Sequence, residues 1–229
     1  EQLLATLRDA RGRINIPGFY DNVKRMSVVE RRAFAGLPHS DRRYKNAIGA
    51  PELQGEFGYT TLERVWARPS LDVNGIWSGF TGEGAKTVLP AHARAKVSMR
   101  LVPDQDPNEV AELFSRHIHD LAPDGVRVTV KDLHGGWPWA ANPESPLFDA
   151  AATALERAFG REPVYVREGG SIPIVPLFEE IFEGPVLLLG FAPPGGNAHA
   201  PNEWMGLSDY HRGIETIARL YDEVAHKGV

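Results

Sequence analysis

Residues 91–102 alternate apolar and polar side chains more regularly than any other stretch of the chain. The apolar positions are Ala93, Ala95, Val97, Met99 and Leu101. A period of two predicts a β-strand whose odd-numbered side chains share one face and whose even-numbered side chains share the other. The neighbouring elements can be placed around this strand.

Four further segments surround it. Residues 70–77 and 126–130 also alternate, which predicts one strand before it and one after it. Residues 106–121 have helical spacing and a proline in the first turn, where proline favours a helix start. Leucines at helical spacing in residues 1–10 predict an earlier helix. The order helix, strand, strand, helix, strand predicts a ferredoxin-like α+β sandwich that lacks its first strand.

The C-terminal part alternates helix and strand. The predicted elements cover residues 146–159, 164–166, 172–182, 185–190 and 208–225 in turn. This order is typical of the end of a layered α/β domain. We therefore predict a domain boundary near residue 166, with an irregular insertion at about 13–66 in the first domain.

Composition restricts both partners and chemistry. The 229 residues carry 25 basic and 30 acidic side chains, spread along the chain without a basic stripe. We expect no nucleic-acid or membrane surface, and small molecules or other proteins are the favoured partners. No cysteine is present, so any metal must be held by imidazole and carboxylate, and a reducing, cytoplasmic compartment fits. Because the chain starts at Glu1 within a helical pattern, we expect a fragment of a longer protein.

Residues 167–173, R-E-G-G-S-I-P, form a candidate ligand-binding turn. Gly170 allows the backbone to approach a ligand closely, and Ser171 stands at the N-cap of the predicted helix, whose free N–H groups would suit a carboxylate. A helix cap without a ligand fits these residues equally well. A nucleophilic serine is disfavoured, because the G-x-S-x-G pattern is absent.

Four other polar residues are candidates. His199 lies in a loop rich in proline and glycine and could bind a metal, although a lone loop histidine is more often solvated. Arg100 could bind a carboxylate through two hydrogen bonds, or form a structural ion pair. Thr87 and His134 border glycine-rich loops and would by default be ordinary turn residues.

Five motifs occur in a characteristic order: G-A-K-T-V-L-P at 84–90, S-M-R-L-V-P at 98–103, H-G-G-W-P-W at 134–139, R-E-G-G-S-I-P at 167–173 and H-A-P-N-E at 199–203. Together they resemble the carnosinase-type dipeptidases. These belong to a dinuclear-metal peptidase family that also includes aminoacylases, acetylornithine deacetylase, succinyl-diaminopimelate desuccinylase and glutamate carboxypeptidases. The resemblance covers about residues 70–229, and residues 1–69 fit more loosely.

The resemblance implies a two-domain enzyme. Residues 1–166 would form a lid that also pairs subunits into a homodimer, and residues 167–229 would form the C-terminal part of a catalytic domain that binds two divalent ions, zinc or manganese. His199 would be a ligand to one ion. The peptide would be contacted by residues of both domains, namely Gly170 and Ser171 from the catalytic side and Thr87, Arg100 and His134 from the lid. Arg100 would take the free carboxylate.

The implied reaction is hydrolysis of a peptide or N-acyl amide bond by a water that bridges the two ions and gives its proton to a glutamate. The family's H-x-D-x-x-P motif, bridging aspartate, Glu-Glu pair and partner-subunit histidine find no match here, so no catalytic residue is identified and the chain alone is expected to be inactive. The alternative is a non-catalytic dimerising or peptide-binding module. The incomplete sandwich favours the enzyme, because a lid without its first strand would expose an unpaired edge.

Overall fold

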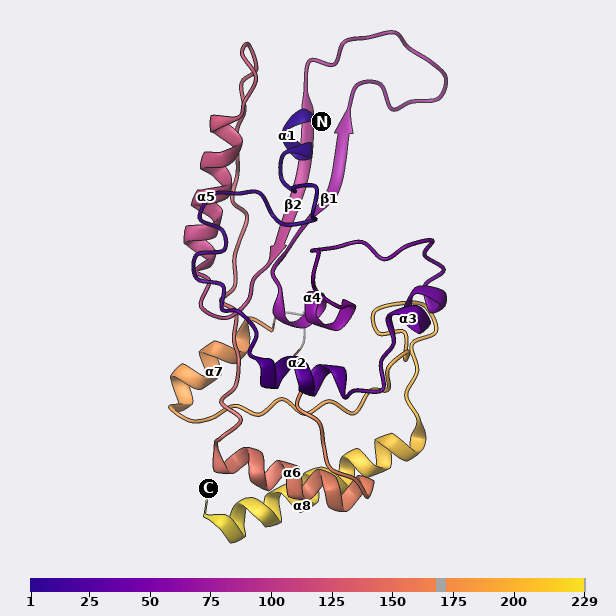
Figure 1. Ribbon diagram of the computed structural model, residues 1–229, viewed down its shortest axis with the longest axis vertical. Coiled ribbons are helices and arrows are strands. Elements are labelled where there is room, and N and C mark those ends of the chain that lie inside the picture. The colour runs from indigo at the N-terminus through magenta and orange to yellow at the C-terminus, as the bar shows by residue number, and fades with distance from the viewer. Residues whose placement is uncertain (168–171, 229) are drawn as a thin grey trace. The chain divides into compact units, whose positions relative to one another are not determined.

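The computed structural model describes residues 1–167 and 172–228 (Figure 1). The chain forms two compact units. Unit 1 comprises residues 1–139 and 166–173, and unit 2 comprises residues 140–165 and 174–229. This division differs from the boundary expected near residue 166. The helix within residues 140–165 packs on the C-terminal helix, and the segment 166–173 returns to unit 1.

Unit 1 contains an antiparallel hairpin of β1 (Ser70–Ser78) and β2 (Ala93–Arg100), joined by a wide loop (Figure 1). Ser70 pairs with Arg100 at one end of the hairpin, and Ser78 pairs with Ala93 at the other. The register shifts between Val73 and Gly75. The strands predicted at 70–77 and within 91–102 are therefore confirmed, and their ends differ by two residues or fewer.

The core of unit 1 lies between this hairpin and α5 (Pro107–Asp120). Its buried residues are Leu7, Ile14, Ile16, Phe19, Leu71, Val110 and Ile118. Val97 and Met99 pack against them, as the alternation of β2 predicts. Asp106 caps α5 by accepting a hydrogen bond from the Asn108 N–H at 2.7 Å, so the predicted helix start is also confirmed.

Three predicted strands are not found among the described residues. Residues 126–130, 164–166 and 185–190 run as extended chain without ladder hydrogen bonds to another strand. Val128 and Val130 still pack against the core of unit 1. Alternation thus indicates an apolar face, but it does not supply a partner strand. A ferredoxin-like sandwich and a layered sheet were predicted. Within the described ranges, the structure instead has helices and one two-stranded sheet.

The N-terminal part of unit 1 is helical only in short pieces. After α1 (Gln2–Ala5), the expected insertion at about 13–66 contains α2 (Val28–Ala35), α3 (Asp41–Ala47) and the start of α4 (Thr61–Ala67). Serine or threonine caps each of these three helices through its side-chain oxygen. Such caps satisfy N–H groups that a short helix would otherwise leave unpaired.

A buried arginine joins the insertion to the end of α4. Arg68 is 8% exposed and donates two hydrogen bonds to the Glu56 carboxylate, at 2.7 and 2.8 Å. Burial acts to lower the pKa of Arg68, but the hydrogen bonds and charge of Glu56 outweigh it, so that the pKa is raised. The guanidinium carbon lies 5.0 Å from the ring centre of Tyr20 and 4.6 Å from that of Tyr59. Arg68 is therefore held by charge and by two cation–π contacts.

The stack continues on both sides of Arg68. The Arg13 guanidinium lies 4.2 Å from the Tyr20 ring centre, and the Arg31 guanidinium lies 5.0 Å from that of Tyr59. Arginine and tyrosine thus alternate over five members, and we call this set the Arg–Tyr stack. It connects residues 13–20, α2, the loop before α4 and the end of α4.

Glu30 connects α2 to the segment that returns to unit 1. Its Oε2 accepts a hydrogen bond from the Ser27 N–H at 2.8 Å, which completes a capping box. Its Oε1 accepts one from Nη2 of Arg167. Burial acts to raise the pKa of Glu30, but the Ser27 N–H and the Arg167 charge outweigh it, so the pKa lies below its ordinary value of 4.5.

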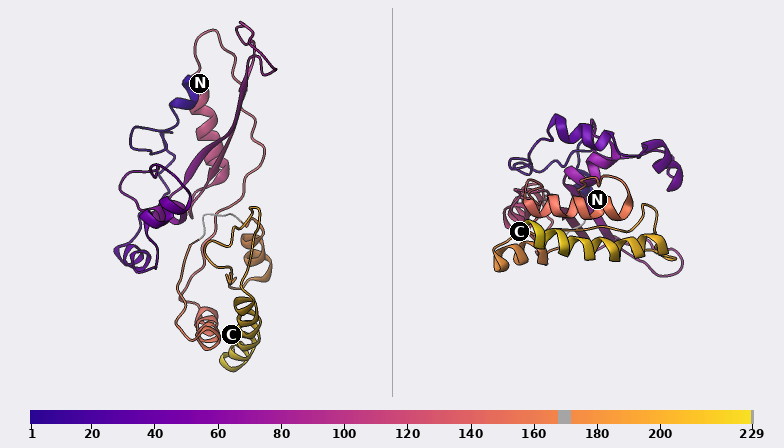
Figure 2. Two further views of the ribbon diagram at one scale, coloured as in Figure 1. Left: turned by 90° about the vertical axis from the view of Figure 1, so that its right-hand side faces the viewer. Right: turned by 90° about the horizontal axis from the view of Figure 1, so that it is seen from below.

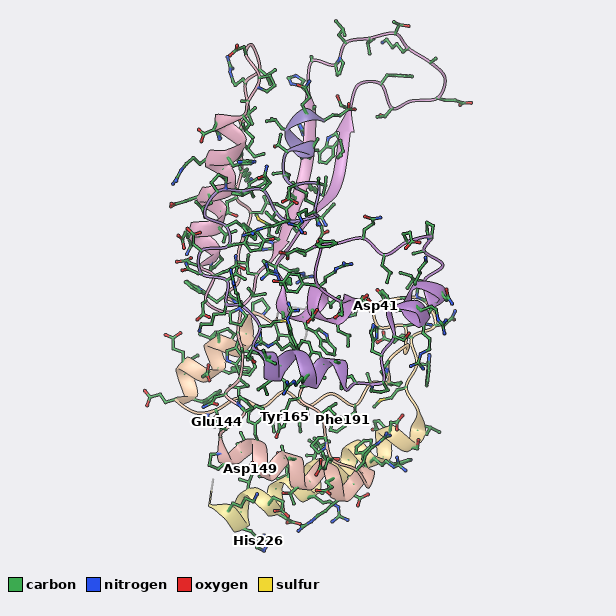
Figure 3. All side chains as sticks on the ribbon, viewed as in Figure 1. Asp41, Glu144, Asp149, Tyr165, Phe191 and His226 are labelled. Carbon is green, nitrogen blue, oxygen red and sulfur yellow. The ribbon has the colours of Figure 1, made fainter. Side chains whose placement is uncertain are left out.

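Unit 2 is built on two helices, α6 (Pro146–Phe159) and α8 (Leu207–Lys227), which pack side by side (Figures 1 and 2). Their buried residues are small: Ala150, Ala151, Ala154, Gly213 and Thr216. Tyr165 and Phe191 come from extended segments and cover α6, where their rings meet Phe148 and Phe159 (Figure 3). α7 (Ile174–Phe182) follows Pro173. None of the described helices is long and apolar enough to cross a membrane.

We expect Arg68→Met to lower the free energy of unfolding of unit 1 by about 3–5 kcal/mol, because it leaves the Glu56 carboxylate buried without its partner. Urea denaturation followed by tryptophan fluorescence measures this loss. Arg219→Met is the control, since it breaks an exposed ion pair with Glu215 within α8 and should change stability by less than about 0.5 kcal/mol. Equal losses in the two variants would contradict the role of the Arg–Tyr stack.

Glu30→Gln should show a pH-dependent loss of stability. A carboxyl group whose pKa is depressed in the folded state stabilises the fold above its unfolded pKa, and this contribution disappears as the pH falls through the folded pKa. The difference in unfolding free energy between wild type and variant should be about 1 kcal/mol or less at neutral pH, because both side chains of the pair are partly exposed. It should shrink once the pH falls below 4.5. Urea titrations at several pH values test this, and a difference that grows in acid would be inconsistent with the ion pair.

Candidate functional site

Arg100 is the last residue of β2 and stands opposite Ser70 in the hairpin. The turn that follows is fixed by a buried side chain. Gln105 is 2% exposed; its Oε1 accepts a hydrogen bond from the Val102 N–H at 3.0 Å, and its Nε2 donates one to the Phe19 carbonyl at 2.9 Å. Gln105 thereby sets the path of the chain directly after Arg100. The sequence analysis did not identify Gln105, because one neutral polar residue between two aspartates carries no distinctive pattern.

His134 is brought to the same end of unit 1. The backbone of Gly135 passes the start of α5 so closely that a Cβ atom there would lie 3.1 Å from Cβ of Pro107. The turn after Arg100 leads directly to Pro107, so His134 and Arg100 both belong to this end of the unit. We call it the Arg100 end.

Thr87 lies elsewhere. It belongs to the loop between β1 and β2, beyond the pair of Ser78 and Ala93, whereas Arg100 is at the opposite end of the hairpin. A strand rises about 3.3 Å per residue, so β2 alone separates these ends by about 23 Å, and an extended dipeptide spans only about 7 Å. The structure therefore does not bring Thr87 together with Arg100 and His134, contrary to their expected joint contact with the peptide from one lid.

Gly170 and Ser171 lie outside the described residues. The described residues on either side of them belong to unit 1, not to unit 2 as the predicted boundary implies. Arg167 is bonded to Glu30, and Pro173 approaches Gly136, where a Cβ atom would lie 3.4 Å from its Cγ. The described residues that flank the candidate turn, Arg167 and Pro173, therefore both contact the unit that carries Arg100.

His199 lies in a loop of unit 2 with unusual backbone geometry. Its φ is 61°, and Asn197 and Asn202 also adopt left-handed conformations, with φ of 56° and 61°. A hydrogen bond from the Trp204 N–H to the Gly196 carbonyl at 2.9 Å closes the loop. Left-handed residues other than glycine cost about 1–3 kcal/mol each and concentrate at functional sites. Asparagine and histidine adopt this conformation more readily than most residues other than glycine, so these residues suit the tight path of the loop.

The described residues do not assemble a metal centre by themselves. Across residues 1–167 and 172–228, no three histidine, aspartate or glutamate side chains gather closely enough to hold an ion. His199 could supply one ligand, and the others would have to come from outside the described part of the chain. The described residues at the Arg100 end provide an arginine and a histidine, and no nucleophile or general base is identified among them.

The chain matches a model of peptidase family M20/M25/M40 over residues 16–223. It is 32% identical over 226 residues to the Cys-Gly metallodipeptidase dug1 of Schizosaccharomyces pombe, covering 97% of this chain and 48% of that protein. It is 30% identical over 226 residues to the human Beta-Ala-His dipeptidase, covering 97% of this chain and 45% of that protein. The M20 family metallo-carboxypeptidase Sso-CP2 from Sulfolobus solfataricus superposes with a TM-score of 0.81 at 29% identity, over 96% of this chain and 50% of that chain.

The chain therefore spans about half the length of the relatives it matches. The proteins named are peptidases, two of them metallopeptidases by name, and the resemblance to carnosinase-type dipeptidases is confirmed. The small sheet and its helices have an M20 peptidase-like α/β fold. The chain belongs to peptidase family M20/M25/M40.

Proposed function

We propose that the complete protein is a metal-dependent hydrolase that cleaves the peptide, or N-acyl amide, bond of dipeptide-like substrates with a free C-terminal carboxylate. This chain would supply the substrate-clamping half of its site. The observation that supports the proposal is the Arg100 end, where β2 ends at Arg100, the turn after it is hydrogen-bonded to the buried Gln105, and Gly135, next to His134, packs on Pro107. Relatives named as a Cys-Gly metallodipeptidase and a Beta-Ala-His dipeptidase support the substrate class.

The residues have distinct proposed roles. Arg100 binds the substrate carboxylate through two hydrogen bonds, and His134 contacts the substrate beside it. Gly170 and Ser171 keep their proposed contacts with the substrate. Thr87 also keeps its proposed substrate contact, but the substrate that it reaches would not be the one bound by Arg100 of the same chain. His199 is one ligand of two divalent ions, zinc or manganese, which when bound would supply an activated water. A general base would come from outside this chain.

Unit 1 is also the proposed homodimer surface. The hairpin and its loop expose large apolar side chains, among them Ile76, Trp77, Phe80 and Leu89, the last of which is 98% exposed. Exposed apolar clusters of this kind mark protein interfaces. A cytoplasmic location is part of the proposal, and a chain without cysteine needs no oxidising compartment.

A second candidate is a non-catalytic dimerising or peptide-binding module derived from the same family. One observation favours it, namely that the described residues gather no metal centre. Such a module would use the Arg100 end to bind a peptide carboxylate without cleaving the peptide. Hydrolysis by the complete protein separates the two candidates.

Arg100→Ala in the complete protein should lower kcat/KM for dipeptides by about 100-fold, because a charge-assisted bidentate contact is lost. For the matching C-terminal amides, which carry no carboxylate, the fall should be within about threefold. Arg94→Ala is the matched control, since Arg94 lies on the same face of β2 at its other end and should leave both rates nearly unchanged. Equal losses for dipeptides and amides in Arg100→Ala would exclude the carboxylate role.

His199→Ala should lower the amount of bound divalent metal in the complete protein by about one ion per chain, because a terminal imidazole ligand is removed. Elemental analysis after gel filtration measures the metal content without relying on activity. His226→Ala, which removes an exposed histidine near the end of α8, is the control and should keep the wild-type content. A wild-type metal content in His199→Ala would remove His199 from the ligand set.

A further inference from the structure

The register of the hairpin shifts at Asn74, the one asparagine in the sequence that is followed by glycine. Val73 pairs with Val97, and the next pair is Gly75 with Lys96. Asn74 therefore has no partner residue across the ladder. Such an extra residue is a β-bulge, which interrupts the ladder locally. Asn74 is exposed, and among the described residues its carboxamide makes no side-chain hydrogen bond.

Beyond Asn74 the hairpin no longer packs on the core. Before the bulge, Leu71 is buried and its neighbour strand contributes Val97 to the core of unit 1. After the bulge, residues 75–78 pair with residues 93–96, and all of them are exposed except the partly buried Gly75. We call these two segments the outer half of the hairpin. A two-stranded ribbon without a buried face is marginally stable in water, so the outer half can open while the core stays folded.

We propose that Asn74 is a spontaneous modification site, at which the chain is converted to aspartate and isoaspartate through a succinimide. The backbone nitrogen of Gly75 attacks Cγ of Asn74, and the new N–Cγ bond closes the ring. The Cγ–Nδ2 bond breaks, and the amide leaves as ammonia with the proton from the Gly75 N–H. Water from the solvent then opens the ring. Opening at Cγ gives aspartate, and opening at the main-chain carbonyl carbon gives isoaspartate.

Two features of the bulge favour this reaction. Gly75 has no Cβ atom, so no side chain hinders the approach of its nitrogen to Cγ. The attack also requires the peptide unit between Asn74 and Gly75 to rotate, and at this point the ladder is already interrupted. Asn197 is an exposed asparagine that lacks both features. It is followed by Ala198, and its Nδ2 donates a hydrogen bond to the Asn202 carbonyl at 3.5 Å.

The two products change the hairpin differently. Both place a carboxylate where a neutral amide stood. In isoaspartate the main chain also runs through Cγ, which lengthens β1 by one carbon atom at the bulge. The outer half carries Ile76 and Trp77, which belong to the proposed homodimer surface. Isoaspartate therefore displaces these two side chains relative to the core, and its effect on association rests on the proposed homodimer.

The space around Gly75 permits a selective substitution. A Cβ atom at Gly75 would lie 3.6 Å from Cζ3 of Trp77, which is an ordinary packing distance, and the φ angle of Gly75 is not positive. The folded hairpin can therefore accept alanine at this position. The added methyl group hinders attack by the backbone nitrogen, while Asn74 itself is unchanged. Gly75→Ala thus blocks the reaction without removing the reacting amide.

The complete protein is incubated in mildly alkaline buffer made with heavy-oxygen water, digested and analysed by mass spectrometry. Peptides that contain Asn74 should lose the amide, gain the heavy oxygen atom and separate into aspartyl and isoaspartyl forms. The heavy oxygen distinguishes conversion in the folded protein from conversion during digestion. Peptides that contain Asn197 should keep their amide over the same time, and Gly75→Ala should lose the conversion at Asn74. Conversion at Asn74 that is no faster than at Asn197, or equally fast in Gly75→Ala, would overturn the proposal.

A second comparison tests whether local opening of the outer half is sufficient. Arg68→Met, which is expected to destabilise unit 1, should convert Asn74 at the wild-type rate, because opening of the outer half leaves the core folded. Strongly accelerated conversion in Arg68→Met would mean that the reaction waits for unfolding of unit 1. That result would overturn the role of the outer half.

Gel filtration of fresh and aged complete protein tests the effect on association. The isoaspartyl fraction of aged protein should elute later than the fresh homodimer, and aged Gly75→Ala should elute with the fresh protein. A monomeric fresh protein would contradict the proposed homodimer, while the mass spectra still decide whether Asn74 is converted. Isoaspartyl protein that dimerises as well as fresh protein would overturn the displacement of Ile76 and Trp77.

Discussion

The Arg68 guanidinium, paired with Glu56 between the rings of Tyr20 and Tyr59, determines much of unit 1. Arg68 directly follows α4, and β1 begins two residues later at Ser70. Ser70 is the hairpin partner of Arg100. Arg68 therefore holds the insertion against the chain two residues before β1, the strand that pairs with the end of β2 at Arg100.

Local sequence patterns correctly predicted those elements of unit 1 that depend on side-chain alternation and on helix capping. The alternation around Val97 and Met99 correctly gave the inner face of β2, and Asp106 with Pro107 gave the start of α5. The expected strands at 126–130, 164–166 and 185–190 were wrong within the described structure. Alternating or continuous apolar residues show that a segment has a surface to bury. A strand also needs a second strand to which it can form hydrogen bonds, and distant parts of the chain determine whether that strand is present.

The candidate site was predictable to a similar extent. Arg100 and His134 remain predicted substrate contacts; Arg100 ends β2, and Gly135, next to His134, packs on Pro107 at the start of α5. Thr87 was expected with them but lies at the far end of the hairpin, since motif order along the chain carries no information about strand direction. The contact of Glu30 with Arg167 and that of Gln105 with Phe19 had no local signal, because the partners are remote in sequence. Long-range polar contacts of this kind become visible only in the folded chain.

We propose that this chain forms the substrate-clamping half of a metal-dependent dipeptidase. Dipeptide hydrolysis by the complete protein, measured before chelation, after chelation and after zinc or manganese is added back, tests it most directly. We expect hydrolysis that is abolished by the chelator and restored by one of the two ions. Hydrolysis that survives complete removal of metal, or no hydrolysis with either ion present, would contradict it.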